Sequence, residues 1–224
     1  MNFRLTKERR KDNIISVICY LKKILSLQIG EANMNTKNLV FVALFSSIMG
    51  VLGLIPPIAL SITPVPITLQ SLGVMLAGGL LGSRLGALSQ LVFLLIVGVG
   101  APLLAGGRGG LSVFVGPSAG YLLGYIVGAF VIGYLIERLR EVSIIKVLCI
   151  NIIGGIFVVY VFGILVQAFV MDISVWETMK VSVVFLPGDC IKAIIAAILV
   201  TKLHRSLKHI ITPALKSGKY TKAG

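Results

Sequence analysis

The stretch Val181–Thr201 reads VSVVFLPGDCIKAIIAAILVT. It is about as long as a helix must be to cross the roughly 30 Å hydrocarbon core of a bilayer. Asp189 and Lys192 interrupt its apolar run near the middle, where each charge alone costs about 3 kcal/mol or more. Because they are three positions apart, both side chains share one face of a helix, where opposite charges can meet. We therefore expect this face to point into the protein or a wet cavity rather than toward lipid.

Two interpretations of this charged pair remain open. It is either a structural ion pair that fixes helix packing, or a polar anchor for a ligand, as ionisable residues inside membranes often are. Pro187 and Gly188 come directly before the pair. A Pro–Gly step inside a span predicts a break in the helix, whose freed backbone groups need partners.

The composition of the whole chain predicts an integral membrane protein. Its 224 residues are 57% hydrophobic and 13% charged, with a mean hydropathy of +1.00. No soluble domain of this size buries so much apolar surface. The net charge of +13 would suggest nucleic acid binding in a soluble protein. Here the basic residues lie outside the apolar stretches, so membrane topology explains them and we expect no nucleic acid partner.

No pattern in the sequence predicts catalysis, a metal or a cofactor. The chain lacks the G-x-x-x-x-G-K-[ST] phosphate loop, so it does not hydrolyse ATP by that route. The glycine-rich run Gly106–Gly110 has neither the Lys nor the Ser or Thr that this loop requires. The three cysteines, Cys19, Cys149 and Cys190, are too far apart in the sequence to suggest a disulfide or a metal site. The two histidines, His204 and His209, both follow the last span.

Residues 1–34 form a basic extension that differs from the rest of the chain. Apolar residues between Ile14 and Ile29 repeat at helical spacing, which predicts an amphipathic helix on the membrane surface. A cleaved signal peptide is a rival interpretation, but the small-residue cleavage site is missing and Lys22 and Lys23 interrupt the apolar run. In a third interpretation translation starts at Met34, and the preceding segment is not native.

Residues 35–205 predict a membrane domain of six transmembrane helices, followed by a basic cytoplasmic tail at 206–224. The expected spans are roughly 39–55, 67–81, 85–100, 118–136, 147–171 and 181–201. Prolines between the first two spans predict an uncharged loop at 56–66. Residues 101–117, APLLAGGRGGLSVFVGP, are too rich in Gly and Pro for a regular helix. Irregular backbone near membrane depth must be covered by protein or line a cavity.

The distribution of Lys and Arg predicts the orientation of these spans. Nearly all of them fall on the side of the two termini, whereas Arg108 and Lys180 fall on the opposite side. Basic residues concentrate on the cytoplasmic side of membranes. We therefore expect an all-α, multi-pass cell membrane protein with both termini in the cytoplasm. The uncharged loop and the glycine-rich loop then face outward, on the side from which Asp189 and Lys192 enter the last span.

This topology predicts a ligand pocket that opens to the exterior. Arg108 is either a solvated loop residue or a cation for an anionic ligand, since guanidinium suits carboxylates. Asn151 in the fifth span either bonds a neighbouring helix or contacts the ligand. Small residues in the first span, Ala43 and Ser47, are either ordinary helix residues or a face on which another helix docks. Glycines in the fourth span predict close helix contact: Gly120, Gly124 and Gly128.

Four stretches of the chain closely resemble the BioY family, the biotin-binding S components of energy-coupling-factor (ECF) transporters. They are Ile67–Gln70 (ITLQ), Pro102–Gly110 (PLLAGGRGG), Gly116–Gly124 (GPSAGYLLG) and Leu186–Lys192 (LPGDCIK). The resemblance covers about Thr36 to Arg205, and the first 34 residues look unlike the family. It implies a six-helix bundle that binds biotin near the outer surface, under the first and third loops. It also implies two kinds of partner, a transmembrane coupling subunit (T component) and two cytoplasmic ATPases.

The resemblance also implies roles for single residues. Such families dock on the T component through an A-x-x-x-A pattern in the first helix, which Ala43 and Ser47 match with one conservative departure. The expected substrate-binding residues are Asp189, Lys192, Arg108, Tyr121, Gln70 and Asn151. We expect Asp189 to accept a ureido N–H of biotin, Lys192 to donate to either end of biotin, and Arg108 to neutralise its valerate. The alternative is a stand-alone secondary transporter of biotin or another small vitamin.

Overall fold

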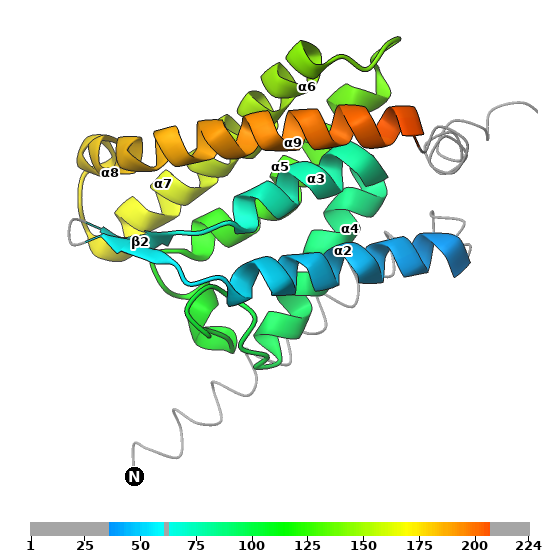
Figure 1. Ribbon diagram of the computed structural model, residues 1–224. Helices are drawn as coiled ribbons and strands as arrows, with labels where there is room; N and C mark the ends of the chain where they lie inside the picture. The colour runs from blue at the N-terminus through cyan, green and yellow to red at the C-terminus, as the bar shows by residue number, and fades with distance from the viewer. Residues whose placement is uncertain (1–35, 61–62, 207–224) are drawn as a thin grey trace, which may run out of the picture. The chain divides into compact units, whose positions relative to one another are not determined.

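The computed structural model describes residues 36–60 and 63–206, so the predicted N-terminal helix and the tail beyond Ser206 lie outside it. The first four spans within these residues are α2 (Thr36–Leu54), α3 (Gln70–Leu81), α4 (Ser83–Gly98) and α5 (Ala119–Glu137) (Figure 1). The fifth span consists of α6 (Ile144–Asn151), the π-helix η2 (Ile152–Val158) and α7 (Val159–Met171). The sixth consists of α8 (Val175–Ser182), the 3₁₀ turn η3 (Val183–Phe185) and α9 (Leu186–Ser206).

These six spans are the predicted transmembrane helices. The first, fourth, fifth and sixth are apolar and 19 to 32 residues long, enough to cross a bilayer. The apolar helices α3 and α4 are shorter, at 12 and 16 residues. The extended segment at 63–69 precedes α3 on the outer side. The second span is therefore helical only in its inner part. The prediction of a helical, multi-pass membrane protein is confirmed.

The outer loop between the first two spans is a β-hairpin, which the sequence analysis did not predict. Strand β1 (Ile58–Leu60) pairs antiparallel with β2 (Thr63–Ile67). Pro64 and Pro66 lack the N–H that a central strand would need, but each strand of a two-stranded sheet has one free edge where proline is tolerated. Val65, between the two prolines, is buried in the core.

The sixth span shows the predicted break. The 3₁₀ turn η3 interrupts it, and Pro187 takes the second position of the new helix α9, where a missing N–H is tolerated. The connection between the expected fifth and sixth spans, 172–180, is shorter, because α8 already begins at Val175. Ser174 starts α8 by accepting a hydrogen bond from the backbone N–H of Glu177 at 3.2 Å.

The glycines of α5 confirm the predicted close helix contact. Helix α5 packs against α3, α4 and α7. A Cβ atom built on Gly120 would lie 2.2 Å from the backbone oxygen of Phe162, and one on Gly128 would lie 2.7 Å from that of Gly154. Only glycine allows the fourth and fifth spans to approach this closely.

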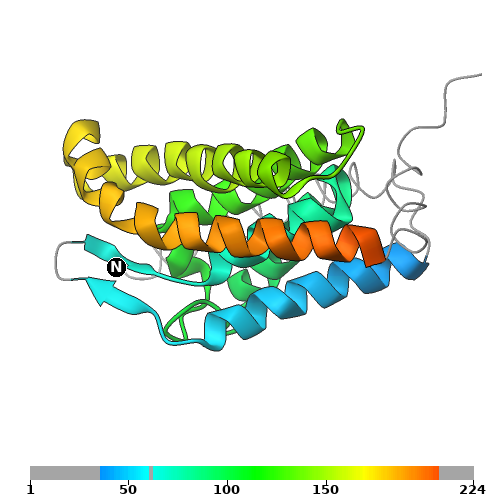
Figure 2. The ribbon, with the colours of Figure 1, turned by 45° about the horizontal axis from the view of Figure 1, so that its top comes forward.

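The two ends of the bundle differ in what they carry. The start of α2, the end of α9 and the α5–α6 connection lie at one end, and the hairpin and the α7–α8 connection lie at the other (Figures 1 and 2). At the first end the Glu137 carboxylate accepts a hydrogen bond from the backbone N–H of Ser83 at 2.7 Å, which ties α5 to the start of α4. This end also carries the basic residues of the connections, so it is the cytoplasmic end, and α2 begins and α9 ends there.

Candidate ligand-binding site

A cavity that is open to the surface lies among the outer ends of the helices. The hairpin strand β2, the glycine-rich loop and helices α3, α5, α7 and α9 contribute to it. Apolar and aromatic side chains form most of its wall: Val65, Ile67, Leu104, Leu122, Tyr125, Val159 and Phe185. Polar groups converge on this wall from Asp189, Lys192, Gln70, Ser71 and Arg108.

Asp189 and Lys192 line this cavity and form an ion pair. Both lie near the start of α9 and are buried, with relative exposures of 6% and 5%. Lys192 Nζ lies 2.7 Å from Asp189 Oδ1. The prediction that the pair faces the protein interior and not lipid is confirmed.

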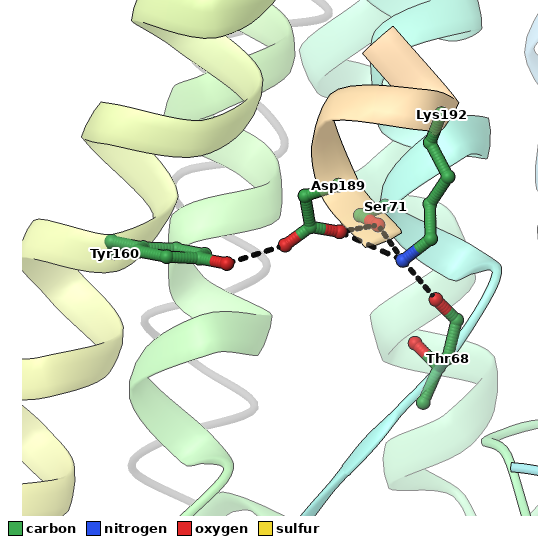
Figure 3. Close-up of polar contacts among 5 residues, drawn as sticks. All are labelled: Thr68, Ser71, Tyr160, Asp189 and Lys192. Atoms are coloured by element: carbon green, nitrogen blue, oxygen red, sulfur yellow. Dashed lines mark hydrogen bonds and ion pairs between the residues drawn. The ribbon is translucent and has the colours of Figure 1, made fainter. Parts of the chain in front are cut away.

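The Lys192 ammonium has used all of its hydrogen-bond donors. Besides Asp189, Nζ donates to the backbone oxygen of Thr68 at 2.6 Å and to Ser71 Oγ at 3.1 Å (Figure 3). Thr68 lies between β2 and α3, where the chain is not helical, so its carbonyl needs a partner from elsewhere. An ammonium has three donors, so Lys192 is saturated by the protein.

The Asp189 carboxylate, in contrast, keeps acceptor capacity. Its Oδ1 accepts from Lys192 and, at 3.0 Å, from Ser71 Oγ, while Oδ2 accepts from the Tyr160 hydroxyl at 2.6 Å (Figure 3). A carboxylate offers about four acceptor positions. Three are filled by the protein, and the remaining one is on Oδ2.

Sequence reasoning missed three members of this network: Thr68, Ser71 and Tyr160. A signal for Ser71 existed, because the polar step Gln70–Ser71 opens an otherwise apolar helix. Thr68 contributes its backbone carbonyl, which no residue pattern reveals. Tyr160 lies on a long apolar span, nine positions after Asn151. In a regular α-helix this spacing would place Tyr160 on the face opposite Asn151, away from α9.

Arg108 reaches the cavity from a tight turn of the glycine-rich loop. The backbone N–H of Leu104 donates to the Arg108 carbonyl at 3.0 Å, and Gly106 and Gly107 adopt φ values of 80° and 69°. Two consecutive left-handed residues are readily tolerated only as glycine. Arg108 Nε donates to the backbone oxygen of Ala105 at 3.2 Å. Within 36–60 and 63–206, no hydrogen bond is found for its two terminal nitrogens.

Tyr121 and Gln70 also line the cavity, but the protein already binds the Tyr121 hydroxyl and the amide nitrogen of Gln70. The Tyr121 hydroxyl donates to Gln167 Oε1 at 3.1 Å and lies 3.2 Å from Ser182 Oγ. The Tyr121 ring meets the rings of Tyr160 and Phe185 edge-on, with centroids 6.2 and 6.5 Å apart. The Gln70 side-chain amide donates to the Leu103 carbonyl at 3.2 Å.

Asn151 is not among the residues that line the cavity. Its Nδ2 donates to the backbone oxygen of Ala193 on α9 at 3.3 Å. Of the two interpretations left open by the sequence, the structure supports a bond between helices. Asn151 Oδ1 is buried and has no hydrogen-bond partner among the described residues.

Ala43 and Ser47 lie on the exposed side of α2 and do not line the cavity. The Ser47 hydroxyl donates to the Ala43 carbonyl at 2.9 Å, so its own helix satisfies it. Large apolar residues on the same helix are also exposed: Leu39, Val40, Leu44, Val51 and Leu54. The two small side chains therefore lie on an exposed, apolar face of the helix.

The chain is similar in sequence and in fold to known proteins. The model of the BioY family matches residues 26–209, which extends beyond Thr36–Arg205 at both ends. A probable biotin transporter BioY of Bacillus subtilis (strain 168) is 46% identical over 84% of this chain and 97% of its own length. The biotin transporter BioY of Rhizobium etli is 50% identical over 74% and 92%. A crystal structure of the S-component for biotin from an ECF-type ABC transporter superposes with a TM-score of 0.74 at 35% identity, covering 78% of this chain and 95% of that one.

Proposed function

This chain belongs to the BioY family, and we propose that it is the biotin-binding S component of an ATP-driven ECF-type vitamin uptake transporter. It captures biotin at the outer face of the cell membrane and delivers it inward with a T component and two cytoplasmic ATPases. The observation that carries the proposal is the buried Asp189–Lys192 pair, which lines a largely apolar cavity at the outer end of the bundle.

The polar end of the cavity suits the ureido ring of biotin. That ring offers two N–H donors and one carbonyl acceptor. The unfilled position on Asp189 Oδ2 can accept one ureido N–H. Lys192 can donate to the ureido carbonyl only by giving up one of its three protein acceptors. A site that pairs its buried polar groups with one ligand rejects analogues that leave those groups unpaired.

The remaining parts of biotin suit the other walls. The thioether ring is apolar and polarisable, and sulfur packs favourably against aromatic rings. Tyr121, Tyr160 and Phe185 provide such rings. The valerate carboxylate would be neutralised by Arg108, whose guanidinium can bind it with two parallel hydrogen bonds.

The site supports binding and transport rather than catalysis. A catalytic base must be free to exchange a proton with the substrate, and a nucleophile must be free to attack it. Asp189 and Lys192 instead hold one another in an ion pair, and Ser71 and the Thr68 carbonyl bind the same groups. We propose that biotin is the transported ligand and that the chain needs no cofactor of its own.

Transport then depends on partners, because the chain carries no nucleotide-binding motif. We propose that the exposed face of α2 around Ala43 and Ser47 docks on the T component. Small side chains let another helix approach closely in a membrane, where packing drives association.

Uptake of labelled biotin into vesicles tests the proposal. We expect uptake into vesicles that hold this chain with a T component and two ATPases, and only when ATP is supplied. Vesicles that hold this chain alone should bind biotin without accumulating it. Uptake by the chain alone, unaffected by ATP, would instead support a stand-alone secondary transporter.

A further inference from the structure

The fifth span contains a seven-residue π-helix in its middle. This segment, η2 (Ile152–Val158), lies between the regular helices α6 and α7. π-Helical turns are rare and often occur at functional sites, because an extra residue in one turn changes the direction of the side chains that follow. Its effect here can be read from the two polar residues that flank it, Asn151 and Tyr160.

Both flanking residues contact the same neighbouring helix. Asn151 Nδ2 donates to the Ala193 carbonyl, and the Tyr160 hydroxyl donates to Asp189 Oδ2, both on α9. The two residues are nine positions apart. In a continuous α-helix each residue turns by about 100°, so nine positions leave two side chains about 180° apart, on opposite faces. Absorbing one extra residue in a wide turn reduces this angle to about 80°.

Close packing holds the π-helical segment in place. Gly155 lines the cavity, and a Cβ built on it would lie 2.6 Å from the terminal methyl carbon of Met75. A Cβ on Gly154 would lie 2.5 Å from Cγ1 of Ile132. The wide turn therefore fits between α3 and α5 because its two central residues have no side chain.

We propose that the π-helical turn makes Tyr160 the positioning residue of Asp189. The Tyr160 hydroxyl fills one acceptor position on Oδ2, opposite the side of the carboxylate that Ser71 and Lys192 hold (Figure 3). The carboxylate is thereby fixed with one acceptor position left for a ligand. The inference rests on the proposed function, and it adds that the site selects a ligand which presents one N–H donor at this point.

A double-mutant cycle with calorimetric titration of biotin tests this role. We expect Tyr160→Phe to weaken binding about tenfold, because Oδ2 loses the hydroxyl that fixes it and the carboxylate must then be ordered when biotin binds. In the Asp189→Asn background the same change should weaken binding by about threefold or less, since a neutral acceptor gains less from the hydroxyl. An unchanged affinity of Tyr160→Phe, or an equal loss in both backgrounds, would overturn the inference.

Two comparisons make the result specific. Tyr134→Phe removes an exposed hydroxyl of α5 outside the cavity and should leave biotin affinity unchanged. Deleting Ile153, whose side chain is exposed, shortens the wide turn by one residue. Tyr160→Phe should then have no further effect on biotin affinity in the deleted chain. Failure of the unmodified chain to bind biotin would instead reject the proposed function itself.

Discussion

Asp189 and Lys192 can lie inside an apolar helix because each charge meets a partner at hydrogen-bond distance. Their burial has a desolvation cost that the 2.7 Å ion pair and the contacts to Thr68, Ser71 and Tyr160 offset. Spacing alone predicted that the two charges meet. It could not predict which partners complete them, because those partners come from the second and fifth spans and from the segment just before the second.

Arg108 provides a test at the same scale. We expect Arg108→Gln to weaken the binding of biotin about fivefold, the effect of about 1 kcal/mol for a partly exposed charged contact. Binding of biotin amide, which has no carboxylate, should be unchanged. Calorimetric titration with both ligands checks this. An equal loss for both would show that Arg108 supports the loop and does not bind the valerate.

At the scale of elements, hydrophobic length and charge spacing predicted the six helices well. The irregular elements were less predictable, since each depends on contacts made after folding. The hairpin β1–β2 forms where prolines suggested only a loop, and its edges tolerate them. The π-helix η2 depends on the close fit of Gly154 and Gly155 between neighbouring helices, which no pattern within the span records.

The glycines of α5 give a prediction for this scale. Gly120→Ala should destabilise the protein by about 1–3 kcal/mol, because the new Cβ would overlap the backbone of Phe162. Gly50→Ala is the matched change in α2, where the Cβ would meet only the Leu103 side chain at 3.6 Å. We expect Gly50→Ala to leave the thermal midpoint unchanged or raise it, since alanine favours helix. Equal midpoints for the two variants would contradict this packing.

At the scale of the whole molecule, the cavity opens at the end of the bundle that has few basic residues. Labelling by a membrane-impermeant maleimide in intact cells tests this orientation. In a chain with its native cysteines replaced by serine, Ser112→Cys in the outer loop should react directly. Arg140→Cys in the α5–α6 connection should react only after the membrane is permeabilised. The opposite pattern would place the cavity on the cytoplasmic side.

The apolar face of α2 gives a prediction about assembly. Ala43→Leu and Ser47→Leu put large side chains where another helix would approach closely, and each should abolish ATP-dependent uptake by the complete transporter. Biotin affinity of the isolated chain should not change, because neither residue lines the cavity. Val51→Leu, a control at an exposed position that is already large, should retain uptake. Normal uptake by both small-to-large variants would exclude this face as the docking site.

The central claim is that biotin from outside the cell binds to the buried Asp189–Lys192 pair in the last span. Titration calorimetry of biotin against the purified chain and its Asp189→Asn variant tests it most directly. We predict tight binding to the unmodified chain and a loss of tenfold or more in the variant, since a hydrogen bond to a charged group contributes about 1.5–3 kcal/mol. Equal affinities of the two proteins would contradict the claim.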